Sequence, residues 1–215
     1  MEDISGVPAD YVREFSRVYA NSENSIIFWG MGISQHVHGT DNSRCLIALS
    51  LITGHVGRPG TGLHPLRGQN NVQGASDAGL IPMVYPNYQS VEDIDIRSFF
   101  EDKWGRSLDP LKGLTVVEIM NRIVSGQMFG MYVMGENPAM SDPDQNHART
   151  ALSKLQHLVV QDIFFTETAW FADVIFPASA QPEKAGTYTN SNRQVQIGFP
   201  VRKTPGDAKQ DWKLI

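Results

Sequence analysis

The stretch MFGMYVMGENP, residues 128–138, has the composition of a buried β-strand that ends in a polar turn. Its first seven residues are apolar apart from Gly130, and Gly135, Glu136, Asn137 and Pro138 follow directly. Short apolar runs closed by Gly, Asn and Pro are typical of strands buried on both faces. Runs of the same kind predict further strands at residues 26–29, 157–160 and 174–177.

Helical patterns alternate with these strands. Apolar residues at helical spacing predict a helix over residues 9–20, and a second helix capped by Thr40, Asp41 or Asn42 carries Cys45 in its apolar stripe. Thr115 and Glu118 form a capping-box pattern, and another helix is expected after residues 141–144. The alternation predicts the α/β class, with doubly wound, mostly parallel sheets and helices on both faces. We expect residues 80–112 to form an irregular segment with at most a short helix, and residues 178–193 to form a polar loop.

The polar clusters of the chain follow predicted strands. They lie at residues 31–35, 135–138 and 161–168. Because ligands of parallel sheets bind beyond the carboxyl ends of strands, we expect these clusters to face one crevice. Asp162 could accept hydrogen bonds from a purine edge or cap the following segment, Thr166 could meet a phosphate or cap a helix, and Gly135 could admit a nucleotide or form an ordinary turn.

Residues 65–79, PLRGQNNVQGASDAG, form a polar stretch with one arginine. A guanidinium beside several amides suits a small carboxylate or a phosphate, and the alternative is a plain surface loop. No G-x-G-x-x-G motif follows a strand and no P-loop lysine motif occurs, which disfavours NAD or ATP in their usual cradles.

Composition narrows the class of protein. The 215 residues carry a net charge of −5, which argues against a nucleic-acid surface, and no run is long and apolar enough for a membrane span. Without a signal peptide pattern, we expect a cytoplasmic protein with a small ligand. Cys45 is the only cysteine and is predicted to lie in the core, while His36 and His38 are interpreted as loop residues, so no metal ligand is predicted. The apolar pattern that begins at residues 211–215 suggests an excised fragment.

Five motifs together resemble the catalytic subunit of molybdopterin-dependent formate dehydrogenases, above all the soluble NAD-linked type. They match in order along nearly the whole chain: WGMGISQ at 29–35, RGQNNVQGA at 67–75, GENP at 135–138, QDIFFTETA at 161–169 and ADVIFP at 172–177.

The resemblance implies two molybdopterin guanine dinucleotides around a molybdenum or tungsten ion, one in each of two α/β domains. Residues 1–67 would be the closing part of one domain and residues 68–215 most of the second. Arg67 matches the arginine that orients formate, and Gln69 lies beside it. The remaining matched positions would contact the cofactor; they are Met31 and Gln35 in the first domain and Asn137, Gln161, Asp162, Lys184 and Asp211 in the second.

The chain also departs from the family pattern. It lacks the iron–sulfur segment, the metal-ligating cysteine or selenocysteine with its neighbouring histidine, and the C-terminal barrel-like domain. We therefore expect the chain alone to be inactive, with the remaining segments of the subunit and electron-transfer subunits as partners. The alternatives are another molybdopterin oxidoreductase, such as a nitrate reductase, and a non-catalytic nucleotide-binding assembly module.

Overall fold

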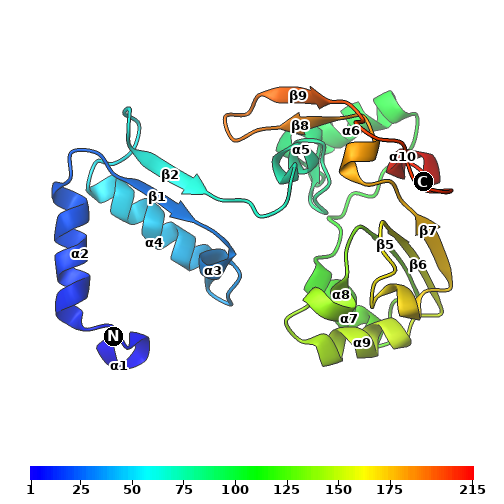
Figure 1. Ribbon diagram of the computed structural model, residues 1–215, viewed down its shortest axis with the longest axis horizontal. Coiled ribbons are helices and arrows are strands. Elements are labelled where there is room, and N and C mark those ends of the chain that lie inside the picture. Colours follow the sequence, from blue (N-terminus) through cyan, green and yellow to red (C-terminus); the bar gives the residue numbers. More distant parts are fainter. The chain divides into compact units, whose positions relative to one another are not determined.

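The computed structural model describes residues 1–215, which divide into two compact units, Met1–Val72 and Gln73–Ile215 (Figure 1). The sequence-based domain boundary lies between residues 67 and 68, slightly before this division. None of the helices has the length and apolarity needed to cross a bilayer.

The first unit is built on a parallel strand pair. β1 (Ile26–Trp29) and β2 (Gly62–Pro65) pair in register, and the chain between them forms α3 (Met31–Ser34) and α4 (Gly39–Ile52). α1 (Glu2–Ser5) and α2 (Ala9–Asn21) precede the strands. The predicted helix near residues 9–20 and the predicted strand at 26–29 are both confirmed.

Two predictions for α4 are wrong. His38 occupies the N-cap position, and no side chain caps the helix. Cys45 is exposed rather than buried. The face of α4 that is buried runs through Gly39 and Ser50. Because each residue turns the helix by about 100°, Cys45 lies well away from that face, although Leu46 beside it is half-buried.

The buried centre of the first unit is partly polar. The hydroxyls of Tyr19 and Ser50 share a hydrogen bond of 2.9 Å, and the His55 ring lies edge-on to Tyr19. His55 Nε2 donates to the Tyr19 carbonyl oxygen at 2.9 Å, while Arg58 donates to Nδ1 at 3.3 Å. These bonds hold α2, α4 and the segment after α4 together.

The second unit contains a three-stranded parallel sheet in the order β5-β6-β7, formed by Gly130–Met134, His157–Asp162 and Val174–Pro177. The predicted α/β class with parallel sheets is confirmed. α8 (Pro138–Ser141) and α9 (Gln145–Ser153) connect β5 to β6, and the 3₁₀ turn η2 (Ala169–Phe171) connects β6 to β7.

The main core of this unit lies between the sheet and its helices. Val133, Leu158 and Val160 pack with Leu152 of α9, and α7 (Val116–Val124) adds Met120 and Ile123. The predicted capping box at the start of α7 is confirmed, since Thr115 and Glu118 exchange both hydrogen bonds. The N–H and the hydroxyl of Thr115 both donate to the Glu118 carboxylate, and these two bonds lower the pKa of Glu118.

The segment from residue 80 to 112 is more ordered than predicted. β3 (Val84–Tyr85) and β4 (Gln89–Ser90) form a small antiparallel ribbon around the turn η1 (Pro86–Tyr88), and α6 (Ile94–Trp104) has eleven residues. Apolar contacts explain this order, because Tyr85, Val91 and Phe100 form a small buried core and the exposed Trp104 ring contacts Tyr85 and Phe100. Asp93 caps α6 through two backbone N–H groups.

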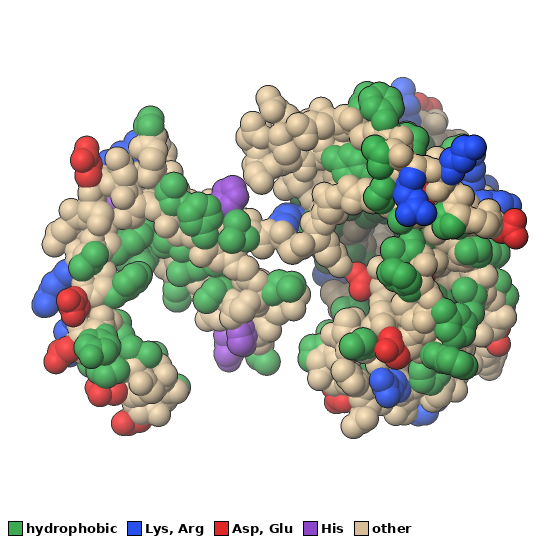
Figure 2. All heavy atoms as spheres, in the orientation of Figure 1, with side chains coloured by type: hydrophobic (Ala, Val, Ile, Leu, Met, Phe, Trp, Pro, Cys, Tyr) green, Lys and Arg blue, Asp and Glu red, His purple; other side chains and the backbone are tan.

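The predicted polar loop at residues 178–193 is wrong in its second half. β8 (Gly186–Thr189) pairs with β9 (Val195–Gly198) as an antiparallel hairpin, and Thr and Tyr residues favour such strands. The remaining elements are α5 (Val72–Asp77), the turn η3 (Gln181–Glu183) and α10 (Asp211–Leu214). Figure 2 shows hydrophobic side chains exposed on the surface of both units.

Candidate functional site

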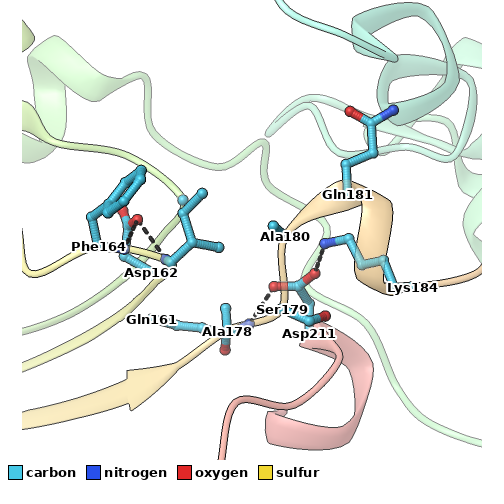
Figure 3. A pocket seen from close by; sticks show the side chains of 11 residues that line it. Gln161, Asp162, Phe164, Ala178, Ser179, Ala180, Gln181, Lys184 and Asp211 are labelled. Carbon is cyan, nitrogen blue, oxygen red and sulfur yellow. Dashed lines mark hydrogen bonds and ion pairs between the residues drawn. The ribbon is translucent and has the colours of Figure 1, made fainter. Parts of the chain in front are cut away.

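A cavity of about 330 Å³ lies at the carboxyl ends of β5, β6 and β7. Gly135 follows β5, Gln161 and Asp162 end β6, and Ala178 and Ser179 follow β7. The structure thus brings two of the three polar clusters of the sequence to one pocket, as parallel-sheet topology requires. Figure 3 shows Asp162 on one side of it and Lys184 and Asp211 on the other.

Five of the residues predicted to contact a cofactor line this pocket: Gly135, Gln161, Asp162, Lys184 and Asp211. Gly135 has a φ of 65°, which favours glycine, and its N–H donates to the Gln161 carbonyl oxygen at 2.8 Å. The chain turns away from the sheet at Gly135, and because glycine has no side chain, nothing at this position projects into the pocket. The contacts of these five residues with a cofactor stay predictions.

The polar wall of the pocket is a chain of hydrogen bonds. Gln161 is fully buried and donates through Nε2 to Asp211 Oδ1 at 2.8 Å, while Lys184 Nζ forms an ion pair with Asp211 Oδ2. Burial raises the pKa of Asp211, but the hydrogen bonds from Lys184 and Gln161 outweigh it and leave the pKa below its usual value. Asp211 is therefore held ionised beside a cation.

Asp162 forms a turn with its own backbone. Its Oδ1 accepts from the N–H groups of Ile163 at 2.6 Å and Phe164 at 3.1 Å. These two bonds use the lone pairs of Oδ1, so Oδ2 is the oxygen left to accept from a ligand. Oδ1 thus takes the local turn role that the sequence left open for Asp162, and the contact of this residue with a purine edge stays a prediction.

Ser179 is one of the pocket residues that sequence reasoning missed. It is 1% exposed, and its Oγ has no hydrogen-bond partner within residues 1–215. Buried hydroxyls normally have a partner. The signal in the sequence was its position, because Ser179 stands just beyond the end of a predicted strand, where ligands of such sheets bind.

Two other predicted residues lie outside this pocket. Asn137 Oδ1 accepts from Thr168 N at 3.1 Å and Thr168 Oγ1 at 2.8 Å, and its Nδ2 donates to Glu167 Oε2 at 2.6 Å, a bond that lowers the pKa of Glu167. Asn137 therefore fastens the turn after β5 to the turn after β6. Thr166 Oγ1 accepts from Ala169 N at 3.4 Å, a bond within the turn that leads into η2, whose N-cap is Thr168. The contact of Thr166 with a phosphate stays a prediction.

The first unit gathers its predicted residues at the ends of β1 and β2. Leu66 N donates to Trp29 O at 2.7 Å, which places the start of the 31–35 cluster beside Arg67. Met31 Cε lies 3.8 Å from the position that a Cβ atom on Gly68 would occupy. Gln35 is the C-cap of α3. Gln69 is exposed.

His36 Nε2 bonds to Gly32 O at 2.7 Å. Residues 1–215 contain no group of three or more metal-binding side chains arranged around a common point.

Comparison with known proteins gives consistent matches. The family described as Molybdopterin oxidoreductase matches residues 7–215. The F420-dependent formate dehydrogenase subunit alpha of Methanocaldococcus jannaschii is 47% identical over 99% of this chain, and formate dehydrogenase H of Escherichia coli is 40% identical over all of it. The chain spans only 31% and 30% of those two proteins.

A solved structure supports the fold. Acetylene hydratase from Pelobacter acetylenicus superposes with a TM-score of 0.67 at 17% identity, covering 99% of this chain and 32% of the hydratase. At this level of identity the likeness bears on the fold alone.

Proposed function

Because the chain belongs to the molybdopterin oxidoreductase family, we propose that it is the part of a formate dehydrogenase catalytic subunit that holds one nucleotide of a bis-molybdopterin guanine dinucleotide cofactor. The pocket at the ends of β5, β6 and β7 carries this proposal, because five side chains or turns predicted for cofactor contact line it. Since the chain covers about a third or less of its relatives, the activity belongs to the complete subunit.

The pocket fits a nucleotide in size and in chemistry. A cavity of about 330 Å³ falls within the roughly 300–1,000 Å³ of small-ligand sites. The buried Ser179 hydroxyl lacks a partner, and Oδ2 of Asp162 accepts no hydrogen bond within residues 1–215. Both atoms can accept N–H groups from a bound base, and the hydroxyl can also donate.

The charges of the pocket favour a base over a phosphate. Asp162 and Asp211 supply two carboxylates, whereas Lys184 supplies one ammonium group that already pairs with Asp211. The negative excess suits the N–H edge of guanine and disfavours a phosphate at the same spot. Asp162 would therefore meet the base, while the Lys184–Asp211 pair would form the neighbouring wall.

Formate would bind beside Arg67. A guanidinium pairs with a carboxylate through two parallel hydrogen bonds, so Arg67 would hold formate in a fixed orientation, and Gln69 would add a polar group nearby. The cofactor's molybdenum or tungsten would take up the two electrons that formate loses on oxidation to carbon dioxide. Met31 and Gln35, at the two ends of α3, would contact the cofactor from the first unit.

The partners of the complete subunit follow from the same proposal. Electron-transfer subunits would receive the electrons, and an iron–sulfur cluster would lie in subunit segments outside residues 1–215. The NAD-linked type and a cytoplasmic location stay predictions from the sequence, whereas three relatives are named for F420.

Replacing Arg67 in the complete subunit tests the function. We expect Arg67→Ala to abolish formate oxidation while bound molybdenum or tungsten and guanine nucleotide stay at the wild-type level. Arg17→Ala, on the exposed surface of α2, is the control and should keep activity. Formate oxidation by Arg67→Ala would contradict the assignment, and nitrate reduction without formate oxidation by the wild type would favour a nitrate reductase. A complete subunit without the metal-ligating cysteine or selenocysteine would favour the assembly module.

A further inference from the structure

Phe164 is an exposed aromatic residue at a binding pocket. Its side chain is 73% exposed, yet it lines the cavity together with Asp162. Figure 3 shows its ring beside Asp162, across the cavity from Lys184. A ligand that covers this ring removes a large apolar surface from water, which favours binding of that ligand.

The neighbouring rings differ from Phe164 in this respect. Phe165 packs edge-on against Trp170 with ring centroids 4.9 Å apart. Phe164 has no such ring contact within residues 1–215. Its face is therefore open to a flat partner from outside the chain.

The backbone below Phe164 is fixed. Its N–H donates to Asp162 Oδ1 at 3.1 Å, and Ile163 N donates to the same oxygen at 2.6 Å. This turn ties the ring to the carboxylate whose Oδ2 still lacks a partner. A flat face and a hydrogen-bond acceptor thus stand two residues apart on one hydrogen-bonded turn, an arrangement that suits a planar heteroaromatic ring with N–H groups on its edge.

We propose that Phe164 forms an aromatic wall against which the guanine base of the cofactor stacks, while Oδ2 of Asp162 accepts from the N–H edge of that base. The inference rests on the proposed function and adds a binding residue to its pocket. Stacking would cover the exposed ring and hold the base plane in line with the carboxylate.

Retention of nucleotide by the purified complete subunit tests this role. The variants are Phe164→Leu, which keeps an apolar side chain without a ring, and Phe164→Tyr, which keeps the ring. Phe199→Leu is the matched control, because Phe199 is 74% exposed and does not line the pocket. Guanine nucleotide still bound after timed gel filtration is released with acid and quantified by chromatography, and circular dichroism checks the fold of each variant.

We expect Phe164→Leu to lose nucleotide about tenfold faster than the wild type, as the stacking of one base predicts. Phe164→Tyr and Phe199→Leu should retain it like the wild type. Retention by Phe164→Leu equal to that of the wild type, or equal loss from Phe199→Leu, would overturn the stacking role while leaving the proposed function intact. A wild-type subunit that carries no guanine nucleotide would instead overturn the proposed function together with this inference.

Discussion

The buried amide of Gln161 donates to Asp211 Oδ1 at 2.8 Å, although 50 residues separate the two in the sequence. A carboxylate only accepts hydrogen bonds, so Nε2 of the amide must face Asp211 and Oε1 must face the other way. There Oε1 accepts from the Tyr132 hydroxyl at 2.5 Å. One amide therefore links β5, β6 and α10, and it sets the position of the carboxylate that pairs with Lys184.

Replacing Gln161 by Glu should destabilise the second unit in a pH-dependent way. At neutral pH the new carboxylate would face Asp211 in a buried place, which we expect to lower the free energy of unfolding by about 2–3 kcal/mol. At about pH 5 the loss should shrink, because the introduced carboxyl group of the Gln161→Glu variant, once protonated, can again donate to Asp211.

Urea unfolding at both pH values measures this effect. Gln156→Glu is the control, since Gln156 is exposed just before β6 and should tolerate the charge. An equal loss of stability at both pH values would show that the amide acts by shape rather than by its hydrogen bond.

Replacing Lys184 by Met should move acid unfolding to higher pH. In the wild type the pKa of Asp211 is lower folded than unfolded, so its stabilisation is present above the unfolded pKa and is lost as the pH falls through the folded pKa. Replacing Lys184 removes both its hydrogen bond and its charge, which lower the pKa of Asp211, so this pKa should rise. Carboxyl titration by NMR follows the pKa directly. Lys203→Met, at an exposed position, should leave it unchanged.

The parts of the fold that could be predicted depend on neighbours in sequence. The capping-box hydrogen bonds join Thr115 and Glu118, which are three residues apart. Each strand of the three-stranded parallel sheet is likewise marked by its own apolar run. The pocket was predictable for a topological reason. Once parallel strands are inferred, residues such as Gly135 and Asp162 must meet at one edge.

The parts that could not be predicted depend on distant partners. β8 forms because β9 pairs with it, and the sequence of β8 alone does not identify its partner strand. Cys45 is exposed because the buried face of α4 is set by partners distant in sequence, such as Tyr19 of α2 against Ser50, which a stripe of apolar residues does not identify. Ser179 was missed because its place just beyond a strand is shared by many residues without a ligand, and its buried, unpartnered hydroxyl is visible only in three dimensions.

Replacing Asn137 should loosen the junction of the turns after β5 and β6. Asn137→Ala removes the acceptor of two Thr168 hydrogen bonds, and because Thr168 is fully buried we expect a cost of about 1–3 kcal/mol in the free energy of unfolding. Asn137→Asp keeps an acceptor for Thr168 but replaces the donor to Glu167, so it should raise the pKa of Glu167. NMR titration of Glu167 separates the two effects. An unchanged pKa in Asn137→Asp would contradict the role of the Asn137 amide group.

A double-mutant cycle on Tyr19 and Ser50 should show that the polar centre of the first unit is held by a specific pair. Tyr19→Phe leaves the buried Ser50 hydroxyl without its partner, and Ser50→Ala does the same to the Tyr19 hydroxyl, so each change should cost about 1–2 kcal/mol in the free energy of unfolding. The double variant leaves no orphaned hydroxyl and should therefore cost less than the sum of the two, with a coupling of about 1 kcal/mol measured by urea unfolding. Strictly additive costs would mean that the 2.9 Å contact contributes nothing beyond the packing of the two side chains.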